Sequence, residues 1–350
     1  MILYVGTYSV RGSEGIYLLD FNRDTGKLTM IGTLANPRNP SFLALSPRGP
    51  WLYSVCEEQK AGAVTALALR PGPGEERTLG HQSTLGVGPC HLAVDPTGQW
   101  LVSANYGSGD VALHPIRADG GLEPATDLAR HTGSGPDVER QSQPHAHSAN
   151  FDPSGRFIVA PDLGSDRLMV YELDREQGKL KEHLPGGVVV QPGAGPRHFT
   201  FHANRQWAYL INELDNTIVA YRWDEAGGTL TPVQTLSTLP ADFVGTSYCA
   251  DIHIHPSGRF LYGSNRGHDS LAIFALDPAT GLLEARGYVP TGGEHPRNFA
   301  ISADGEWLLV GNMNSDNIVV FRIGEDGGLE QVGEPFGLPA PVCLLFAAAE

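Results

Sequence analysis

The chain has 350 residues, of which 24 are Lys or Arg and 39 are Asp or Glu, so its formal net charge is −15. An acidic surface repels a phosphate backbone, which argues against a nucleic-acid partner. No apolar stretch approaches the roughly 18 residues that span a bilayer, so no membrane partner is expected. The 43 glycines and 26 prolines favour short strands and tight turns, and hence an all-β fold.

The first residues read at once as a strand, without the charged region, apolar region or cleavage site of a signal peptide. We therefore expect a cytoplasmic protein. The four cysteines show no zinc-type spacing and are expected to be reduced and buried; they are Cys56, Cys90, Cys249 and Cys343.

Three apolar segments, ILYVGTY, GIYLLDF and KLTMIGTL, are predicted as strands within residues 1–39. From residue 40 onward a longer pattern recurs, with an alternating apolar strand, a turn such as Asp-Pro-Ser-Gly, and a second strand with an early aromatic residue. A third strand and a weaker fourth strand follow most copies. The copies begin at Pro40, Pro89, Ala146, Pro196, Cys249 and Pro296. A period of about fifty residues with four strands is typical of a β-propeller blade.

Two polar segments interrupt the repeat. Residues 118–144 form the longest irregular insertion, and residues 71–84 form a smaller one. A long connection inside a compact fold is more often functional than idle, so the longer insertion is a candidate functional loop.

The end of the chain closes the pattern. PVCLLF, from Pro341, matches only the first strand of a blade, whereas residues 1–39 match strands two to four. The sequence therefore predicts one domain over residues 1–350, a seven-bladed β-propeller with four antiparallel strands per blade and one blade closed by both termini.

Propeller connectivity brings the start of each first strand and the end of each second strand to one face of the ring. The equivalent starting positions are Ser41, Cys90, His147, Arg197, Ala250, Arg297 and Val342. The equivalent ending positions are Glu57, Tyr106, Asp162, Glu213, Arg266 and Met313. An Asn that precedes four of these ends is interpreted as a turn-shaping residue, because Asn tolerates the left-handed conformation; it occurs at Asn105, Asn212, Asn265 and Asn312.

Several ionisable side chains thus converge at one channel mouth. Clustered arginines in an acidic protein form an electropositive funnel suited to a carboxylate or phosphate. A carboxylate among them stays ionised and could accept a proton, and a histidine could supply or take one. The alternative is a structural ion pair between Glu213 and Arg197. The converging residues are His147, Arg197, Arg266, Arg297, Glu213 and Asp162.

Other chemistries find no support. The sequence contains no nucleophile-elbow, zinc-protease, P-loop or dinucleotide-binding motif in a predicted structural context that fits it. His145 and His147 face the same side of a predicted strand, but a third metal ligand is lacking. No metal or other cofactor is expected.

Over essentially its whole length the sequence resembles the seven-bladed propeller lactonases, which include propeller-type 6-phosphogluconolactonases and a carboxymuconate cyclase. The segments that carry the resemblance are MILYVGTYS, QPHAHSANFDPSGRF, GPRHFTFHANRQWAYLINEL and FLYGSNRGHDSLAIF. The resemblance implies a catalytic set of one histidine, two arginines and one glutamate. These roles fall on His147, Arg197, Arg266 and Glu213, although His145 lies close enough to His147 to take its place.

The expected reaction is metal-free hydrolysis of an anionic sugar-acid lactone such as 6-phosphoglucono-1,5-lactone. The arginines would bind the anion and stabilise the oxyanion, Glu213 would activate water, and His147 would protonate the leaving ring oxygen. Further substrate contacts are assigned to Arg297, Asp162, His145 and His198. His145 and His198 also have a structural alternative, because polar residues at the start of a strand commonly hydrogen-bond backbone groups.

Two other functions remain open. A lactonising cyclase would use the same arginines, and a non-catalytic propeller could simply hold protein partners. A scaffold would not need cations gathered at the channel mouth. The expected partner is a small anionic lactone, and the expected assembly is a monomer or a weak homo-oligomer.

Overall fold

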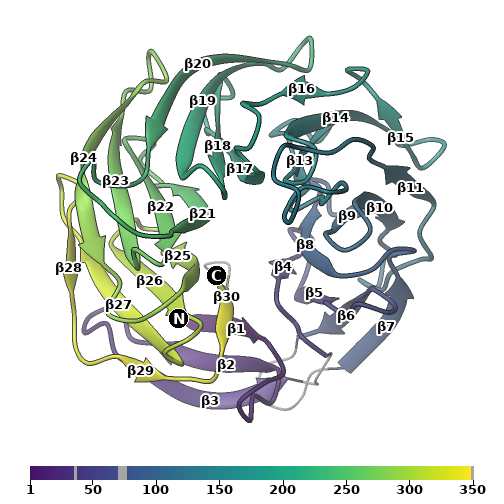
Figure 1. The fold of residues 1–350 in the computed structure, drawn as a ribbon. Coiled ribbons are helices and arrows are strands. Elements are labelled where there is room, and N and C mark those ends of the chain that lie inside the picture. The colour runs from purple at the N-terminus through teal and green to yellow at the C-terminus, as the bar shows by residue number, and fades with distance from the viewer. Residues whose placement is uncertain (35–37, 70–76, 348–350) are drawn as a thin grey trace.

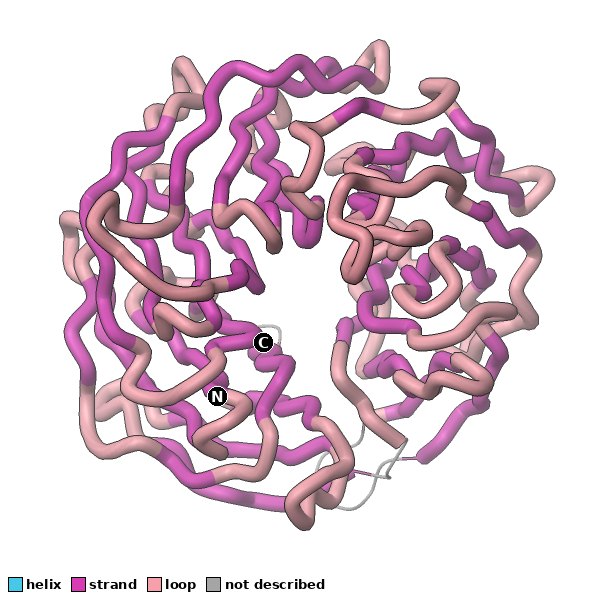
Figure 2. Tube along the Cα trace, viewed as in Figure 1, coloured by secondary structure: helices cyan, strands magenta, loops and turns pink. Residues whose placement is uncertain are grey.

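The computed structural model describes residues 1–34, 38–69 and 77–347. In these ranges the chain consists of strands and loops and contains no helix (Figure 2). Seven antiparallel sheets stand as blades around a central channel, and the first strand of each blade lies innermost (Figure 1). The seven-bladed β-propeller expected from the repeat is confirmed.

Four blades contain four strands each, which follow one another from the inside outward. One consists of β4 (Leu43–Leu45), β5 (Trp51–Cys56), β6 (Ala63–Ala68) and β7 (Arg77–Ser83). The next consists of β8 (Pro89–Val94), β9 (Trp100–Asn105), β10 (Asp110–Pro115) and β11 (Asp127–Arg130). A third consists of β17 (Pro196–Phe201), β18 (Trp207–Asn212), β19 (Thr217–Asp224) and β20 (Thr229–Ser237). A fourth consists of β21 (Tyr248–Ile254), β22 (Phe260–Arg266), β23 (Ser270–Leu276) and β24 (Leu283–Pro290).

Two blades have a divided outermost strand. In each, two short segments pair with the same third strand. One blade consists of β12 (Asn150–Phe151), β13 (Phe157–Asp162), β14 (Arg167–Asp174), β15 (Lys179–Glu182) and β16 (Val188–Val189). The other consists of β25 (Pro296–Ile301), β26 (Trp307–Asn312), β27 (Asn317–Ile323), β28 (Leu329–Gln331) and β29 (Phe336–Gly337).

The seventh blade joins the two ends of the chain, as predicted. Its innermost strand β30 (Pro341–Phe346) pairs antiparallel with β1 (Ile2–Thr7), and Leu3 lies opposite Phe346. The strands β2 (Ile16–Phe21) and β3 (Leu28–Leu34) complete it. Main-chain hydrogen bonds between the first and the last strand of the chain therefore close the ring.

Neighbouring blades interlock through an aromatic side chain and a glycine turn. Trp207, at the start of β18, packs on Gly281 in the β23–β24 turn, where a Cβ would lie 2.2 Å from Trp207 Cδ2. Trp51 packs on Gly120 in the same way. The hydroxyl of Tyr209 also donates to the carbonyl of Gly281 at 3.0 Å. In six blades, the aromatic residue at the start of the second strand is thus a contact with the neighbouring blade.

The recurring asparagine does not adopt the left-handed conformation that the sequence analysis expected. Asn105, Asn212, Asn265 and Asn312 are fully buried within strands, and none has a positive φ. Asn265 Nδ2 donates to the Thr238 carbonyl at 2.8 Å, which ties β22 to the end of β20 in the preceding blade. The left-handed residues lie four positions later, as at Asn216 (φ 54°). Three of the four asparagines therefore link neighbouring blades in this way. All four also donate to the side chain five residues later, across the turn that leads to the third strand.

The two interruptions of the repeat are partly regular. Residues 127–130 of the longer insertion form β11, the outermost strand of its blade. Residues 77–83 of the smaller one form β7, and its residues 71–76 lie outside the described residues. The four cysteines are free and buried, as expected.

Candidate active site

The inner strands carry a β-bulge at the channel mouth. In β17 the pairing with β18 shifts between Pro196 and His198, so Arg197 is the extra residue. The same shift occurs at Cys90 in β8 and at Arg297 in β25. A bulge takes its residue out of the regular alternation of a strand and re-aims the side chain. These residues consequently line one cavity.

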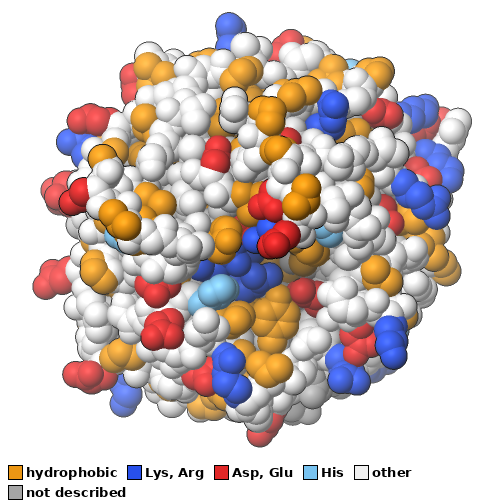
Figure 3. Space-filling view, viewed as in Figure 1, with side chains coloured by type: hydrophobic (Ala, Val, Ile, Leu, Met, Phe, Trp, Pro, Cys, Tyr) orange, Lys and Arg blue, Asp and Glu red, His pale blue; other side chains and the backbone are white. Residues whose placement is uncertain are grey.

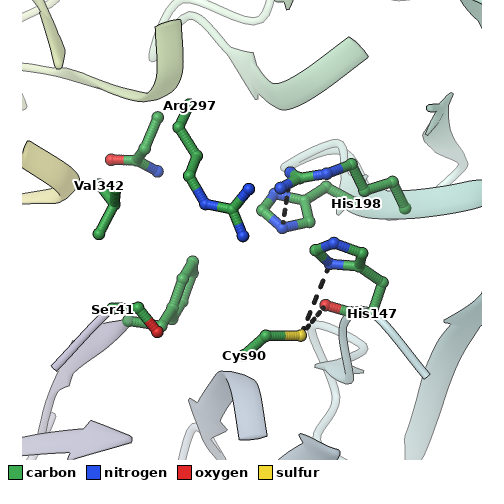
Figure 4. A pocket seen from close by; sticks show the side chains of 9 residues that line it. Ser41, Cys90, His147, His198, Arg297 and Val342 are labelled. Atoms are coloured by element: carbon green, nitrogen blue, oxygen red, sulfur yellow. Dashed lines mark hydrogen bonds between the residues drawn. The ribbon is translucent and has the colours of Figure 1, made fainter. Parts of the chain in front are cut away.

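That cavity lies in the channel and collects the equivalent positions that the repeat identified. His147, Arg297 and Cys90 face one another across it, and the Arg297 side chain reaches to its centre (Figure 4). The complete lining is Ser41, Phe42, Cys90, His147, Arg197, His198, Arg297, Asn298 and Val342. Six of the seven inner-strand positions that the alignment of the blades brought together line this cavity, and Ala250 does not.

Glu213 anchors the arginines from directly behind the end of β18. Its side chain is only 4% exposed, and its Oε2 atom lies 2.9 Å from Arg197 Nε and 2.8 Å from Arg266 Nη2. Its Oε1 atom accepts a hydrogen bond from Arg140 Nη2. Both oxygens are therefore engaged by guanidinium groups, including the predicted ion pair with Arg197.

This environment fixes the charge of Glu213. Burial alone would raise the pKa of the carboxyl, but Arg266 and Arg197, followed by His147 and Arg140, lower the pKa well below its usual range. Glu213 is thus a carboxylate at any pH near neutral. A carboxylate with so low a pKa is a weak proton acceptor and a strong electrostatic anchor.

His147 is buried beside this carboxylate. Its Nε2 atom lies 3.8 Å from Glu213 Oε2, and its Nδ1 atom lies 3.6 Å from Cys90 Sγ. Burial and the nearby Arg197 charge lower the pKa of His147 well below its usual value. The imidazole is therefore neutral at neutral pH. Burial likewise raises the pKa of the Cys90 thiol to about 12, so that sulfur carries no charge.

Arg197 and Arg266 are held by backbone carbonyls as well as by Glu213. Arg266 Nη2 donates to the Cys249 carbonyl at 2.7 Å, and Arg197 Nη1 donates to the Ala250 carbonyl. Burial and the neighbouring arginines lower the pKa of Arg197 to about 10, which still leaves it charged at neutral pH. Within the described residues, Arg197 Nη2 and Arg266 Nη1 make no hydrogen bond to the protein.

Arg297 is the cation with the fewest protein partners in the site. Among the described residues it makes no hydrogen bond or ion pair, and its guanidinium lies 5.4 Å from the Tyr8 ring centroid. Burial would lower its pKa, but Tyr8 and Glu57 raise it, so the charge is retained. Basic side chains and a histidine gather at the hollow centre of this face (Figure 3). A partly buried, unpaired guanidinium is suited to an incoming anion.

Two residues of the site received no role in the sequence analysis. Glu57 accepts hydrogen bonds from Ser41 and from the Tyr8 hydroxyl, at 3.1 Å in the latter case, and burial raises its pKa. The alignment of the second-strand ends, in which Glu57 is equivalent to Glu213, was the sequence feature that could have identified Glu57 as part of the site. Arg140 comes from the long insertion and lies 5.4 Å from the Tyr248 ring centroid. Only the unusual length of that insertion pointed to it.

The remaining predicted contacts lie at different depths. Asp162 is fully buried, and its oxygens accept hydrogen bonds from His131 Nδ1 at 2.6 Å and from the His145 amide at 3.0 Å. We therefore assign Asp162 a supporting role, in which it holds the His145–His147 segment, instead of the direct contact with the substrate that the sequence analysis expected. His145 lies at the rim, stacked on Tyr106 with ring centroids 4.4 Å apart. His198 lies deeper, with its Nε2 atom 3.2 Å from Arg197 Nη1.

Among the residues that the structure describes, no group of three or more His, Cys, Asp and Glu side chains is placed to hold a metal ion. In the same residues no helix is long and apolar enough to cross a membrane.

The fold and the site together define a β-propeller enzyme with a carboxylate, a histidine and several arginines at one channel mouth. A family model for the seven-bladed β-propeller lactonases matches residues 2–346. The chain belongs to this family, and it is accordingly a lactonase, a carboxylic-ester hydrolase.

Several relatives cover nearly the whole chain. A 6-phosphogluconolactonase of Bacillus subtilis is 38% identical over 344 residues, which make up 98% of this chain and 97% of the relative. A putative 6-phosphogluconolactonase of Bacteroides fragilis superposes with a TM-score of 0.92 at 37% identity, covering 99% of this chain and 98% of the other. A periplasmic gluconolactonase of Pseudomonas aeruginosa gives a TM-score of 0.93 at 34% identity, covering 99% of each chain.

Proposed function

We propose that the enzyme hydrolyses an anionic sugar-acid lactone, with 6-phosphoglucono-1,5-lactone as the substrate. The observation that carries the proposal is the unpaired Arg297 guanidinium beside the Glu213 arginine cluster. Relatives named 6-phosphogluconolactonase support the choice of substrate. Four arginines and two carboxylates leave a surplus of positive charge at the mouth, which a phosphate or carboxylate group would balance.

We assign the proton transfers to His147. The sequence suggested Glu213 as the base and His147 as the acid, but guanidinium groups engage both oxygens of Glu213, and the neutral imidazole of His147 can accept a proton, which favours another division. Neutral His147 accepts a proton from the attacking water as the tetrahedral intermediate forms. The resulting imidazolium is stabilised by Glu213 and returns the proton to the ring oxygen as the C–O bond breaks. This cycle balances and needs no metal.

The arginines stabilise the negative charge of the intermediate. The free N–H groups of Arg197 and Arg266 point to a role as donors to the developing oxyanion, and Glu213 holds both guanidinium groups in place beforehand. Arg297 and, at the rim, His145 would contact the anionic substituent and the hydroxyl groups.

The substrate assignment is tested by the initial rate of proton release from fresh 6-phosphoglucono-1,5-lactone, compared with unphosphorylated glucono-1,5-lactone and with the spontaneous background. Loss of one charge-assisted hydrogen bond in Arg297→Gln should raise KM for the phosphorylated lactone about tenfold or more, with little effect on the neutral lactone. A background rate with the phosphorylated lactone would reject this substrate, and carboxymuconates would then test the cyclase reaction. Equal rates with both lactones would show that the phosphate is not recognised.

We also propose a cytoplasmic enzyme that acts as a monomer or weak homo-oligomer without nucleic acid. One solved relative is named a periplasmic gluconolactonase, so the compartment needs its own test. Activity that remains in the spheroplast fraction supports the cytoplasm, and release with the periplasmic fraction contradicts it.

A further inference from the structure

A second polar cluster lies in the channel, on the side of Arg197 away from Glu213. Its centre is the Asp251 carboxylate on β21, which is 4% exposed. His198 Nδ1 lies 2.8 Å from Asp251 Oδ1, His253 Nε2 lies 2.9 Å from Oδ2, and Asn298 Nδ2 donates to Oδ2 at 2.5 Å. The His253 side chain is 42% exposed, so the cluster reaches water. Asp251 has no part in the reaction proposed above.

The contacts determine the tautomer of His198. A guanidinium group has donors only, so His198 Nε2, 3.2 Å from Arg197 Nη1, must be the acceptor. The proton of the neutral ring is then on Nδ1, where it is donated to Asp251. Arg197 Nε meanwhile donates to Glu213. One line of hydrogen bonds therefore runs from Asp251 through His198 and Arg197 to Glu213.

We propose that Asp251 is a positioning residue for the lactonase site. By fixing the Nδ1-protonated tautomer of His198, it makes Nε2 an acceptor that holds the Arg197 guanidinium against Glu213. The proposal rests on the proposed function only in taking Arg197 as a participant in the reaction.

The charge states agree with this arrangement. Burial would raise the pKa of Asp251, but His253 and His198 lower it well below its usual range, so the carboxylate persists. Burial and the Arg197 charge lower the pKa of His198 to about 4, so the ring is neutral at neutral pH. A neutral ring is required, because an imidazolium has no acceptor atom.

Asp251 also has structural contacts, so its own substitution is an ambiguous test. It accepts hydrogen bonds from the amides of Ile252 and Phe299, the second of which joins β21 to β25. His198 provides the cleaner variants. The glutamine of His198→Gln has one amide oxygen to accept from Arg197 and one amide nitrogen to donate to Asp251, whereas His198→Leu can do neither.

The first experiment needs no substrate. Two-bond proton–nitrogen correlation spectra of the folded wild type, with His198 assigned by comparison with His198→Gln, report the protonation of each ring nitrogen. We expect a neutral ring with the proton on Nδ1 near pH 7. A proton on Nε2, or a charged ring, would overturn the proposal.

The second experiment is kinetic. Loss of the acceptor for the buried Arg197 guanidinium should lower kcat about 10- to 100-fold in His198→Leu. The kcat of His198→Gln should be at least about tenfold higher than that of His198→Leu. Asp251→Asn should resemble His198→Leu, whereas Asp152→Asn, in a buried turn carboxylate far from the site, serves as the matched control. Wild-type kcat in His198→Leu, or no recovery in His198→Gln, would overturn the proposal. A wild type without lactonase activity would refute the proposed function, and the spectra would still decide the tautomer.

Discussion

Single residues in this site act through the charge that their neighbours impose. Glu213 stays ionised because guanidinium groups surround it, and His147 stays neutral because it is buried beside Arg197. Both pKa values are lowered, which leaves Glu213 as an anchored anion and His147 as a neutral base, with Glu213 Oε2 and His147 Nε2 3.8 Å apart. Arg140 completes the ring of cations from a loop, and with a side chain that is 33% exposed it is more accessible than Arg197 and Arg266.

Replacing Arg140 by alanine should lower kcat/KM about tenfold, because Glu213 loses one of its charge-assisted hydrogen bonds. The melting temperature should change little, since the Arg140 side chain is partly exposed. Steady-state kinetics and thermal unfolding measure the two effects. Arg205→Ala, which breaks an exposed ion pair with Glu225, is the control. Unchanged kcat/KM in Arg140→Ala would show that the loop arginine has no part in the site.

The neutral state of His147 predicts the pH profile. A base must be unprotonated, and the pKa of His147 lies well below 6.5. The value of kcat/KM should therefore remain constant from neutral pH down past 6.5 and fall only in more acidic solution. The measurement is kcat/KM across this range, with circular dichroism at each pH to confirm folding. A fall centred near pH 7 would contradict the assignment of His147 as the base.

Much of the site could be predicted from the sequence, because equivalent positions of a repeat occupy equivalent places in a ring. His147, Arg197, Glu213 and Arg266 are all brought together as expected. Arg140 could not be placed, since the path of a long loop is not set by the repeat. The role of Asp162 differed because its position in the alignment does not reveal its hydrogen-bond partner, His131.

At the scale of elements, the second strand carries an aromatic side chain that packs on a glycine of the neighbouring blade in six of the seven blades. The sequence shows both the aromatic residue and the glycine turn, but the contact between them is tertiary and could not be predicted from either. The β-bulges that aim Arg197 and Arg297 are equally invisible in the sequence, since their extra residues interrupt no apolar pattern.

Gly281→Ala tests this contact. A Cβ at Gly281 would lie 2.2 Å from Trp207, at a φ of +72°. Gly333 has a similar φ of +71° but no atom within 4 Å of its Cβ position. We expect Gly333→Ala to lower the free energy of unfolding by about 1 kcal/mol and Gly281→Ala by about 2–4 kcal/mol. Urea unfolding measures both, and equal losses would show that the Trp207 contact adds nothing.

At the scale of the whole molecule, the number of blades and the closure by both termini could be predicted because the period and the two incomplete end segments are local features of the sequence. The structure confirms the pairing of β30 with β1. The pH dependence of stability was not predictable, since it depends on which histidines the ring buries. Burial lowers the pKa of His114 to about 4 and also lowers those of His91 and His198, whereas the pKa of His253 is raised.

The sign of the pH effect follows from these directions. A histidine whose folded pKa is lowered binds its proton more readily in the unfolded chain, so stability is complete above pH 6.5 and is lost as the pH falls. For His114, whose pKa shifts from 6.5 to about 4, the loss by pH 4 is about 3 kcal/mol. His114→Asn removes the titration and can keep a hydrogen bond to the Glu123 carbonyl. Chemical unfolding at pH 7 and pH 4 should show a smaller loss for His114→Asn, and identical losses would contradict the buried neutral state.

The most direct test of the central claim is the rate of proton release from 6-phosphoglucono-1,5-lactone catalysed by wild type, Glu213→Gln and Glu225→Gln. We expect Glu213→Gln to keep its fold but to lose about a hundredfold in kcat/KM, since the arginines lose the anion that preorganises them. Glu225→Gln, which alters an exposed ion pair with Arg205, should match wild type. Activity of folded Glu213→Gln equal to that of wild type would contradict the claim that this carboxylate organises the active site.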